Sequence, residues 1–323
     1  MTLQGKILDL KLQALVAARH ASFWQKAIDE HGEEKATAFY SHLGLNHLEK
    51  KSYEWEGLKL SREPKEHEKI AVKGIANAQE SAKESIAKIL LKLREELIED
   101  GLKGIKKLKP ANYHELTLQA SAESRSDLRD RLIRVHQQGR MLVAHELGVL
   151  PKGFVHEAGC SEKFTKNDPA GYQCKCEIKE AVPDDEFDEL DDLTDLTGSR
   201  VTNDVQSRLI DAATRYRLLG LTGTELINAV QNEITAGSVT YIDRASRGLA
   251  HVVINIGRSD EAERRSDEWD RVEYSALLDA NVCEPCAAED GQTASSEDDL
   301  QPAPNPECLG GDMCRCFHVW INQ

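Results

Sequence analysis

The chain has 323 residues, a formal net charge of −15, a hydrophobic fraction of 40% and only 5% aromatic residues. This length allows two or three domains with cores of their own, and the scarcity of aromatic residues favours helices over strand-rich sandwiches. The negative charge argues against binding to duplex nucleic acid, unless basic residues cluster locally. No segment reaches the roughly 20 apolar residues of a membrane span, and the first residues lack a signal-peptide pattern. We therefore expect folding in a reducing cytoplasm, without a membrane partner.

Residues 1–150 are predicted to form an extended helical region. Apolar residues recur at steps of three and four between positions 70 and 97, which indicates an amphipathic helix. The run Asp-Gly-Leu-Lys-Gly at 100–104, followed by Pro110, is expected to end this helix. A second helix is expected at about 126–147, closing before a glycine and a proline.

Residues 151–199 are predicted to be a linker that contains cysteines and an acidic block. The block at 183–196, PDDEFDELDDLTDL, is typical of a solvated linker, and an interaction segment is the alternative. Four donors precede it, enough for a second tetrahedral metal site: His156, Cys160, Cys174 and Cys176. Alternatively, the first two of these bind no metal, or the last two join the later cysteines in the fold.

Residues 200–323 are predicted to form a compact α+β domain. Helical periodicity resumes at 205–219, a capping-box pattern starts the next helix at Thr222, and a third helix is expected at about 240–257. The period then shifts towards two in WDRVEYSALLD, and the final FHVWINQ is a second strand candidate. The predicted fold class is mainly α, with a small α+β C-terminal domain and a zinc-knuckle-like cysteine cluster between two short strands.

The cysteine cluster is the strongest chemical pattern in the chain. Zinc takes four donors at tetrahedral geometry, and structural sites pair a Cys-x-x-Cys turn with donors distant in sequence. In a reducing compartment, clustered thiols mark metal sites more often than disulfides. We interpret the cluster as a structural zinc site in which one thiol is spare. Its candidate ligands are Cys283, Cys286, Cys308, Cys314 and Cys316.

Disulfides or free thiols, and redox chemistry at the Cys-x-x-Cys pair, are the alternatives. A thioredoxin-type pair follows a strand and starts a helix, whereas AAEDGQTASSEDD, which follows Cys286, is a poor start for a helix. The His-Glu pairs lack a second histidine four residues on, and no nucleophile elbow or phosphate-binding loop is present. The interleaved arginines and acids at 243–265 indicate a solvated, ion-paired face, and most histidines are expected at the surface. We therefore expect no enzymatic activity and no small-molecule substrate.

Three runs in the C-terminal part carry a family resemblance. INIGR at 254–258, VEYSALLDANVCEPCAAEDG at 272–291 and CRC at 314–316 resemble the C-terminal signature of the phage Mu F-like head-morphogenesis, or minor capsid, proteins. In such proteins a helix ends at a motif similar to Asn-x-Gly-Arg, and a histidine lies three residues before Cys-Arg-Cys. Here that position is Gly311, and Cys308 is expected to replace the histidine as a ligand. The alternative is that both Cys314 and Cys316 complete the four ligands. The matching residues are Asp279, Cys283, Cys286, Asp290, Gly291, Cys314, Arg315 and Cys316.

The resemblance implies a structural protein of a tailed-phage virion, present in few copies inside the procapsid and bound near the portal protein. It implies the portal and the major capsid or scaffolding protein as partners, packaged DNA as a further one, and a role in head assembly or DNA delivery. The expected location is the virion, and the host cytoplasm during assembly. The alternatives are a zinc-knuckle module that binds nucleic acid and a thiol oxidoreductase.

Overall fold

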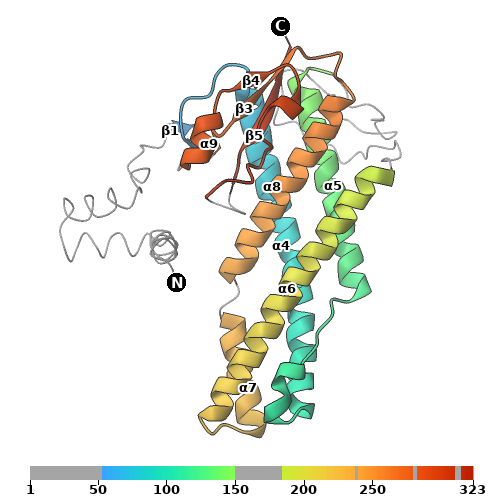
Figure 1. The fold of residues 1–323 in the computed structure, drawn as a ribbon, viewed down its shortest axis with the longest axis vertical. Helices are drawn as coiled ribbons and strands as arrows, with labels where there is room; N and C mark the ends of the chain where they lie inside the picture. Colours follow the sequence, from blue (N-terminus) through green and yellow to red (C-terminus); the bar gives the residue numbers. More distant parts are fainter. Residues whose placement is uncertain (1–52, 150–183, 237–238, 279–281, 310–313, 323) are drawn as a thin grey trace, which may run out of the picture.

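The computed structural model describes residues 53–149, 184–236, 239–278, 282–309 and 314–322 (Figure 1). The described part is mainly helical, with a few short antiparallel strands, which confirms the predicted fold class. The helices are α4 (Glu68–Lys107), α5 (Ala122–Glu146), α6 (Asp184–Leu218), α7 (Gly223–Ala236), α8 (Val239–Glu263) and α9 (Glu284–Glu289), with the 3-10 helices η2 (Pro110–Glu115) and η3 (Glu297–Asp299). The strands are β1 (Tyr53–Trp55), β2 (Leu58–Leu60), β3 (Arg271–Ser275), β4 (Thr293–Ala294) and β5 (Phe317–Ile321).

Long helices form an elongated bundle in which α4 and α5 contact both α6 and α8, and α7 folds back along α6 (Figure 1). A three-stranded antiparallel sheet in the order β4-β3-β5 lies at one end of the bundle, and the α6–α7 turn lies at the other. The predicted strands at both sides of the cysteine cluster are confirmed, and they pair with each other from Arg271↔Ile321 to Ser275↔Phe317. Among the described helices, none is long and apolar enough to cross a membrane.

Helix α4 continues past its predicted stop at the glycines 101 and 104 and ends at Lys107, before Pro110. The prediction was wrong because these glycines admit neighbouring side chains instead of breaking the helix. A Cβ atom on Gly101 would lie 2.3 Å from Leu209 Cδ1, and one on Gly104 would lie 2.6 Å from Leu116 Cδ1. Helix α5 agrees with its prediction: the Ser121 hydroxyl accepts the Ser124 N–H at its start, and a glycine with positive φ follows its end.

The acidic block is helical, so the prediction of a solvated linker at 183–196 was wrong for its described part. Helix α6 begins at Asp184, and its early turns bury Leu190 and Thr194 while leaving acidic side chains on the outer face. Asp191 accepts hydrogen bonds from Arg129 of α5, which ties the block to the bundle. A single hydrophobic cluster extends from Leu60 through the long helices to β5. The described parts of the predicted N-terminal and C-terminal regions therefore share one core.

Helices α5 and α8 touch backbone to backbone where two glycines face each other's helix. A Cβ atom on Gly139 would lie 2.2 Å from Ile254 O, and one on Gly257 would lie 2.1 Å from His136 O. Real Cβ atoms do not approach a carbonyl oxygen this closely, so any side chain at either position would push the helices apart. The two glycines are thus a condition for the observed spacing of α5 and α8.

The close crossing brings charged side chains of α5 and α8 together inside the protein. Arg140 Nε donates to Glu261 Oε2 at 3.0 Å, and neither side chain is exposed. Arg258 forms a two-pronged ion pair with Glu146, and both groups are buried. The prediction of a solvated face was therefore wrong for Arg258, Glu261 and Arg265, which are all buried. The prediction of surface histidines was also wrong for four of them, which are buried because they pack between helices or against the sheet: His136, His145, His251 and His318.

Replacing either crossing glycine by alanine is expected to lower the free energy of unfolding by about 2–3 kcal/mol, because the added methyl group overlaps backbone atoms. Gly198→Ala is the matched control, since its nearest non-local heavy atom would be Arg125 Cγ at 3.9 Å. Gly198 is itself buried, but a Cβ atom there would meet only ordinary van der Waals contact, so alanine should raise the free energy of unfolding by up to about 1 kcal/mol. Urea denaturation of the three variants measures these differences, and equal effects at 139, 198 and 257 would contradict the crossing argument.

Candidate metal centre

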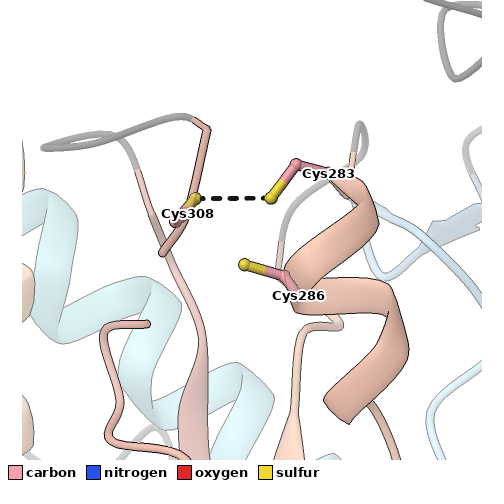
Figure 2. A group of neighbouring side chains, drawn as sticks. All are labelled: Cys283, Cys286 and Cys308. Carbon is pink, nitrogen blue, oxygen red and sulfur yellow. Dashed lines mark hydrogen bonds between the residues drawn. The ribbon is translucent and has the colours of Figure 1, made fainter. Parts of the chain in front are cut away.

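The Cys-x-x-Cys pair lies on a single helical turn that follows β3. Cys283 has an extended backbone and directly precedes α9, whose early turn accepts Pro285 because that position needs no backbone donor. Ala287 N donates to Cys283 O at 2.9 Å and Asp290 N donates to Cys286 O at 3.1 Å, which closes the turn. Residues three apart on a helix share one face, so both thiols point to the same side. Figure 2 shows both side chains directed towards Cys308.

Five thiols meet at this end of the bundle. Cys283 Sγ lies 3.6 Å from Cys308 Sγ (Figure 2). Cys286 Sγ lies 4.0 Å from Cys314 Sγ. In the groups Cys283–Cys286–Cys308 and Cys286–Cys314–Cys316, all sulfur atoms lie within 4.8 Å of one another. Cys286 belongs to both groups, so the two sets form one cluster. The structure thus brings together all five predicted ligands, and the arrangement can hold a metal ion.

Burial and mutual hydrogen bonding make the thiols unequal. Four of the five are buried, and Cys308 is partly exposed. Hydrogen bonds raise the pKa of Cys286: the largest effect comes from Cys308 and the next largest from Cys314. Hydrogen bonds from Cys286, Cys308 and Cys316 lower the pKa of Cys314. The cluster therefore favours a thiolate at Cys314, and thiolates are the form in which cysteine binds metal ions.

The Cys-Arg-Cys run is fixed by the long helices that lie beneath it. The carbonyl oxygen of Cys316 accepts hydrogen bonds from His251 Nε2 at 2.8 Å and from Asn255 Nδ2 at 3.1 Å, both on α8. Arg315 Nε donates to Gln79 Oε1 of α4 at 3.0 Å. Two helices thus hold the approach to β5, and the position of Cys314 and Cys316 follows from theirs.

The Asn-x-Gly-Arg run of α8 has one structural task for each named residue. Asn255 holds Cys316, and Gly257 makes the contact with α5. Arg258 pairs with Glu146 and also donates to the carbonyl oxygen of His318 at 2.6 Å. The sequence predicted that the helix ends at this run, but the helix continues to Glu263. The run is therefore an internal contact site between α8, α5 and β5.

The Asp-Gly pair after α9 connects the cysteine turn to the start of the described chain. Asp290 accepts the Ala276 N–H at 2.9 Å and the Arg62 Nε–H at 2.8 Å. Gly291 has φ +87° and donates its N–H to Tyr274 O at 2.8 Å, which reverses the chain towards β4. Arg62 also donates to both carboxylate oxygens of Glu68 at 2.7 Å. One guanidinium thus joins the Asp-Gly turn to α4.

One local prediction about the cysteines was wrong. The sequence after Cys286 was expected to start a helix poorly, yet residues 284–289 form α9, because Pro285 suits the first turn of a helix, where no backbone donor is needed. This removes one argument against a redox pair. Cys314 and Cys316 directly precede β5, which begins at Phe317. The second candidate site and two residues of the family motif lie outside the described residues: His156, Cys160, Cys174, Cys176, Asp279 and Gly311.

Several residues that support the site were missed from the sequence. Arg62, Glu68 and His251 contact the cysteine end only through the fold, because they are distant from it along the chain. The spacing of His251 and Asn255, four apart on a predicted helix, was the one local feature that could have identified them as a pair.

Comparisons of the chain with protein-family models, with curated proteins and with solved structures found no match. The resemblance to the Mu F-like proteins therefore rests on the motif residues alone and stays a prediction. The clustering of the five thiols is independent of it, since it follows from the fold.

Removing the charge of Glu68 is expected to destabilise the protein in a pH-dependent way. Burial would raise the pKa of this carboxyl, but hydrogen bonds from Arg62, the Lys65 N–H and Ser275 outweigh burial and lower it from 4.5. A lowered pKa in the folded state means that the contribution is complete above the ordinary carboxyl value and is lost as the pH falls through the folded-state value. Glu68→Gln should therefore lower the free energy of unfolding by about 2 kcal/mol at pH 7.

Denaturant unfolding of the wild type and of Glu68→Gln between pH 7 and pH 3 measures this difference, which should shrink on acidification. Glu66→Gln is the control, because the Glu66 side chain is 90% exposed and, within the described part of the chain, its ion pair is with Lys69. Its effect should stay within about 0.5 kcal/mol. A difference for Glu68→Gln that does not change with pH would contradict the assigned role of its charge.

Proposed function

We propose that Cys283, Cys286, Cys308 and Cys314 bind one structural Zn²⁺ ion in a minor capsid, or head-morphogenesis, protein of a tailed phage. The observation that carries the metal site is the spacing of the sulfur atoms. Four ligands at a Zn–S distance of about 2.3 Å have sulfur atoms about 3.8 Å apart. The pairs Cys283–Cys308 and Cys286–Cys314, at 3.6 and 4.0 Å, fit two opposite edges of such a tetrahedron.

Cys316 is the thiol that this assignment leaves out. Its side chain is fully buried, whereas Cys308 and Cys283 lie nearer the surface from which an ion enters. The hydroxyl of Tyr274 lies beside the Cys316 thiol. Burial is the main cause that raises the pKa of this tyrosine, and the Cys316 thiol is the second cause. Cys316 therefore serves as a buried contact below the metal ligands. The Cys-x-x-Cys turn supplies two ligands, and the segment before β5 supplies the other two.

A zinc ion with four thiolate ligands has no free coordination position, so the proposed site is structural and not catalytic. It would replace the thiol protons and fasten the segment around 308–314 to α9. The binding free energy of zinc then contributes to folding, and the end of the molecule without metal should be less stable. The choice of zinc follows from the donor type and the expected compartment.

The biological part of the proposal is supported by the residues that resemble the Mu F-like signature. In the described chain these residues are structural: Asn255, Gly257 and Arg258 connect α8 to its neighbours, and Asp290 and Gly291 shape the turn after the cysteine pair. Such a set suits a docking piece of fixed shape. We propose the portal protein and the major capsid or scaffolding protein as partners, with packaged DNA as a further contact.

The purified chain is expected to contain about one zinc ion, measured by elemental analysis, and its Co²⁺ derivative should show the absorption bands of a tetrahedral thiolate site. Cys314→Ala should lower the zinc affinity at least about 100-fold, because three ligands remain. Cys316→Ala is the matched control and should keep both the stoichiometry and the cobalt spectrum.

The possible outcomes separate the parts of this proposal. Loss of metal in Cys316→Ala with retention in Cys283→Ala would mean that the metal is present but that the ligands are wrongly assigned. Protein without metal, with thiols that titrate freely in the native state, would contradict the zinc site altogether.

The proposed virion role predicts that the chain co-purifies with the portal protein in procapsids at few copies per particle. Cys283→Ala/Cys286→Ala should lower this incorporation, because the docking end loses its metal. Quantitative mass spectrometry of purified particles measures the copy number. If the chain is absent from particles that contain portal and capsid protein, the virion role is contradicted. The proposal of a metal site would not be affected by this result.

A further inference from the structure

The α6–α7 turn lies at the end of the bundle opposite the cysteines (Figure 1). It exposes two adjacent leucines. Leu218 is 84% exposed and Leu219 is 68% exposed. The next most exposed large apolar residue among those described is Leu196, at 48%. A single exposed leucine is ordinary, but two neighbours at the tip of a turn form a small apolar patch that water contacts fully.

The fold itself does not need leucine at these two positions. The turn is a Schellman motif: Leu221 N donates to Tyr216 O at 3.1 Å, Gly220 N donates to Arg217 O at 3.0 Å, and Gly220 has φ +90°. Leu221 and Tyr216 stand at the two positions where this motif commonly carries apolar residues, and both side chains pack against the core. The backbone is thus satisfied, and the motif holds Leu218 and Leu219 outwards.

Basic side chains outnumber acidic ones at the same end, where Glu115 and Glu225 are also exposed, although the chain as a whole is strongly acidic. Helix α4 ends there with three exposed lysines, Lys106, Lys107 and Lys109, and none of them has an ion pair among the described residues. Arg215 and Arg217 lie in the last turn of α6; the first pairs with Glu233 and the second donates to Leu221 O. Bases in a last turn also stabilise a helix end. The leucines therefore carry the argument, and the bases set the sign of the partner.

We propose that this tip docks on an anionic lipid surface, with Leu218 and Leu219 entering the headgroup boundary and the lysines binding the headgroups. The tip is a protruding turn, and a bilayer accepts a protrusion without a shaped recess. Duplex nucleic acid would use the lysines but leave the leucines in water. Lysine suits the site because its apolar stem can lie along the lipid while the ammonium group stays at the headgroups.

The charge of the rest of the molecule fixes the orientation. A net charge of −15 repels an anionic bilayer from the acidic faces, so only the basic end can approach, with the bundle end-on. From its sequence, the protein was expected to have no membrane partner, because no segment is long enough to span a membrane. Peripheral docking through a turn requires no span. This inference concerns the end opposite the cysteines and does not depend on the proposed metal site or virion role.

Sedimentation of the full chain, as purified, with vesicles tests the proposal. Vesicles of phosphatidylglycerol and phosphatidylcholine in equal parts should bind the protein, vesicles of phosphatidylcholine alone should bind it much less, and added salt should weaken binding. Leu218→Ser/Leu219→Ser should lower the affinity for anionic vesicles about tenfold or more. Leu196→Ser, on the same helix but away from the tip, is the control and should change it less than about twofold.

Lys106→Glu/Lys107→Glu should weaken binding to a similar extent and reduce its dependence on salt. Thermal unfolding followed by circular dichroism should be unchanged in the leucine variants, whose substituted side chains are exposed. The lysine variant should unfold at a slightly lower temperature, because it places two acidic side chains in the last turn of α4. The proposal would be overturned if Leu218→Ser/Leu219→Ser bound anionic vesicles as well as Leu196→Ser does. It would also be overturned if the wild-type chain did not sediment with anionic vesicles. It would also be overturned by DNA binding without vesicle binding, or by self-association that the leucine substitutions remove while vesicles have no effect.

Discussion

The contact of α5 with α8 at Gly139 and Gly257 sets the geometry on which the cysteine end depends. Because the two backbones touch, Arg258 reaches Glu146 across the interface and the carbonyl oxygen of His318 in β5. An unpaired arginine at this depth would be costly, so its partners must lie where they do. The position of β5 relative to α8 follows from these bonds. The segment that carries Cys314 and Cys316 enters β5 directly, and its place is therefore set by a helix crossing that contains no cysteine.

The cysteine end differs from the rest of the core in what fills it. The main hydrophobic cluster consists of leucine, isoleucine, valine and alanine, whereas the buried members of the second cluster are mostly thiols, with Tyr274, Ala276 and Val282. Thiols bury less apolar area than leucine, so this end gains less from the hydrophobic effect. Polar contacts supply part of the stabilisation that this smaller apolar area does not provide. Arg62 connects Asp290 to Glu68, and Arg315 donates a hydrogen bond to Gln79. A cation bound by four thiolates would add the interaction that such a core otherwise lacks.

The sequence predicts the local elements well and their relations poorly. Periodicity identifies α5 and the strands around the cysteines, because each depends on residues close together in the chain. It misjudges Gly101 and Gly104, since a glycine that admits a neighbouring helix has the same local pattern as a helix stop. The acidic block reads as a linker by composition, but Leu190 and Thr194 have the spacing of a buried helix face. The linker prediction followed the many charges of this block and overlooked the spacing of these few residues.

The candidate site shows the same division between local and distant information. The Cys-x-x-Cys turn and the later cysteines are visible in the sequence, and the structure brings all five together. Which four suit one ion depends on distances between sulfur atoms, and no spacing along the chain supplies these. The link of Arg62 and His251 to the cysteine end could not be predicted, because Asp290 and Cys316, their partners there, lie more than 60 positions away. The buried arginines were assigned to the surface because alternating charges on a helix look the same whether they face water or each other.

The two ends of the molecule are connected without a break in α4. This helix has 40 residues, so it spans about 60 Å, starting beside Arg62 and the Asp-Gly turn and ending at the basic tip. Its glycines lie against Leu209 and Leu116, where they bring neighbouring elements closer and introduce no hinge. Both ends are therefore held at a fixed separation by one packed helix. A partner bound at the tip would be placed at a constant distance from whatever the cysteine end contacts, and this separation is a consequence of helix packing alone.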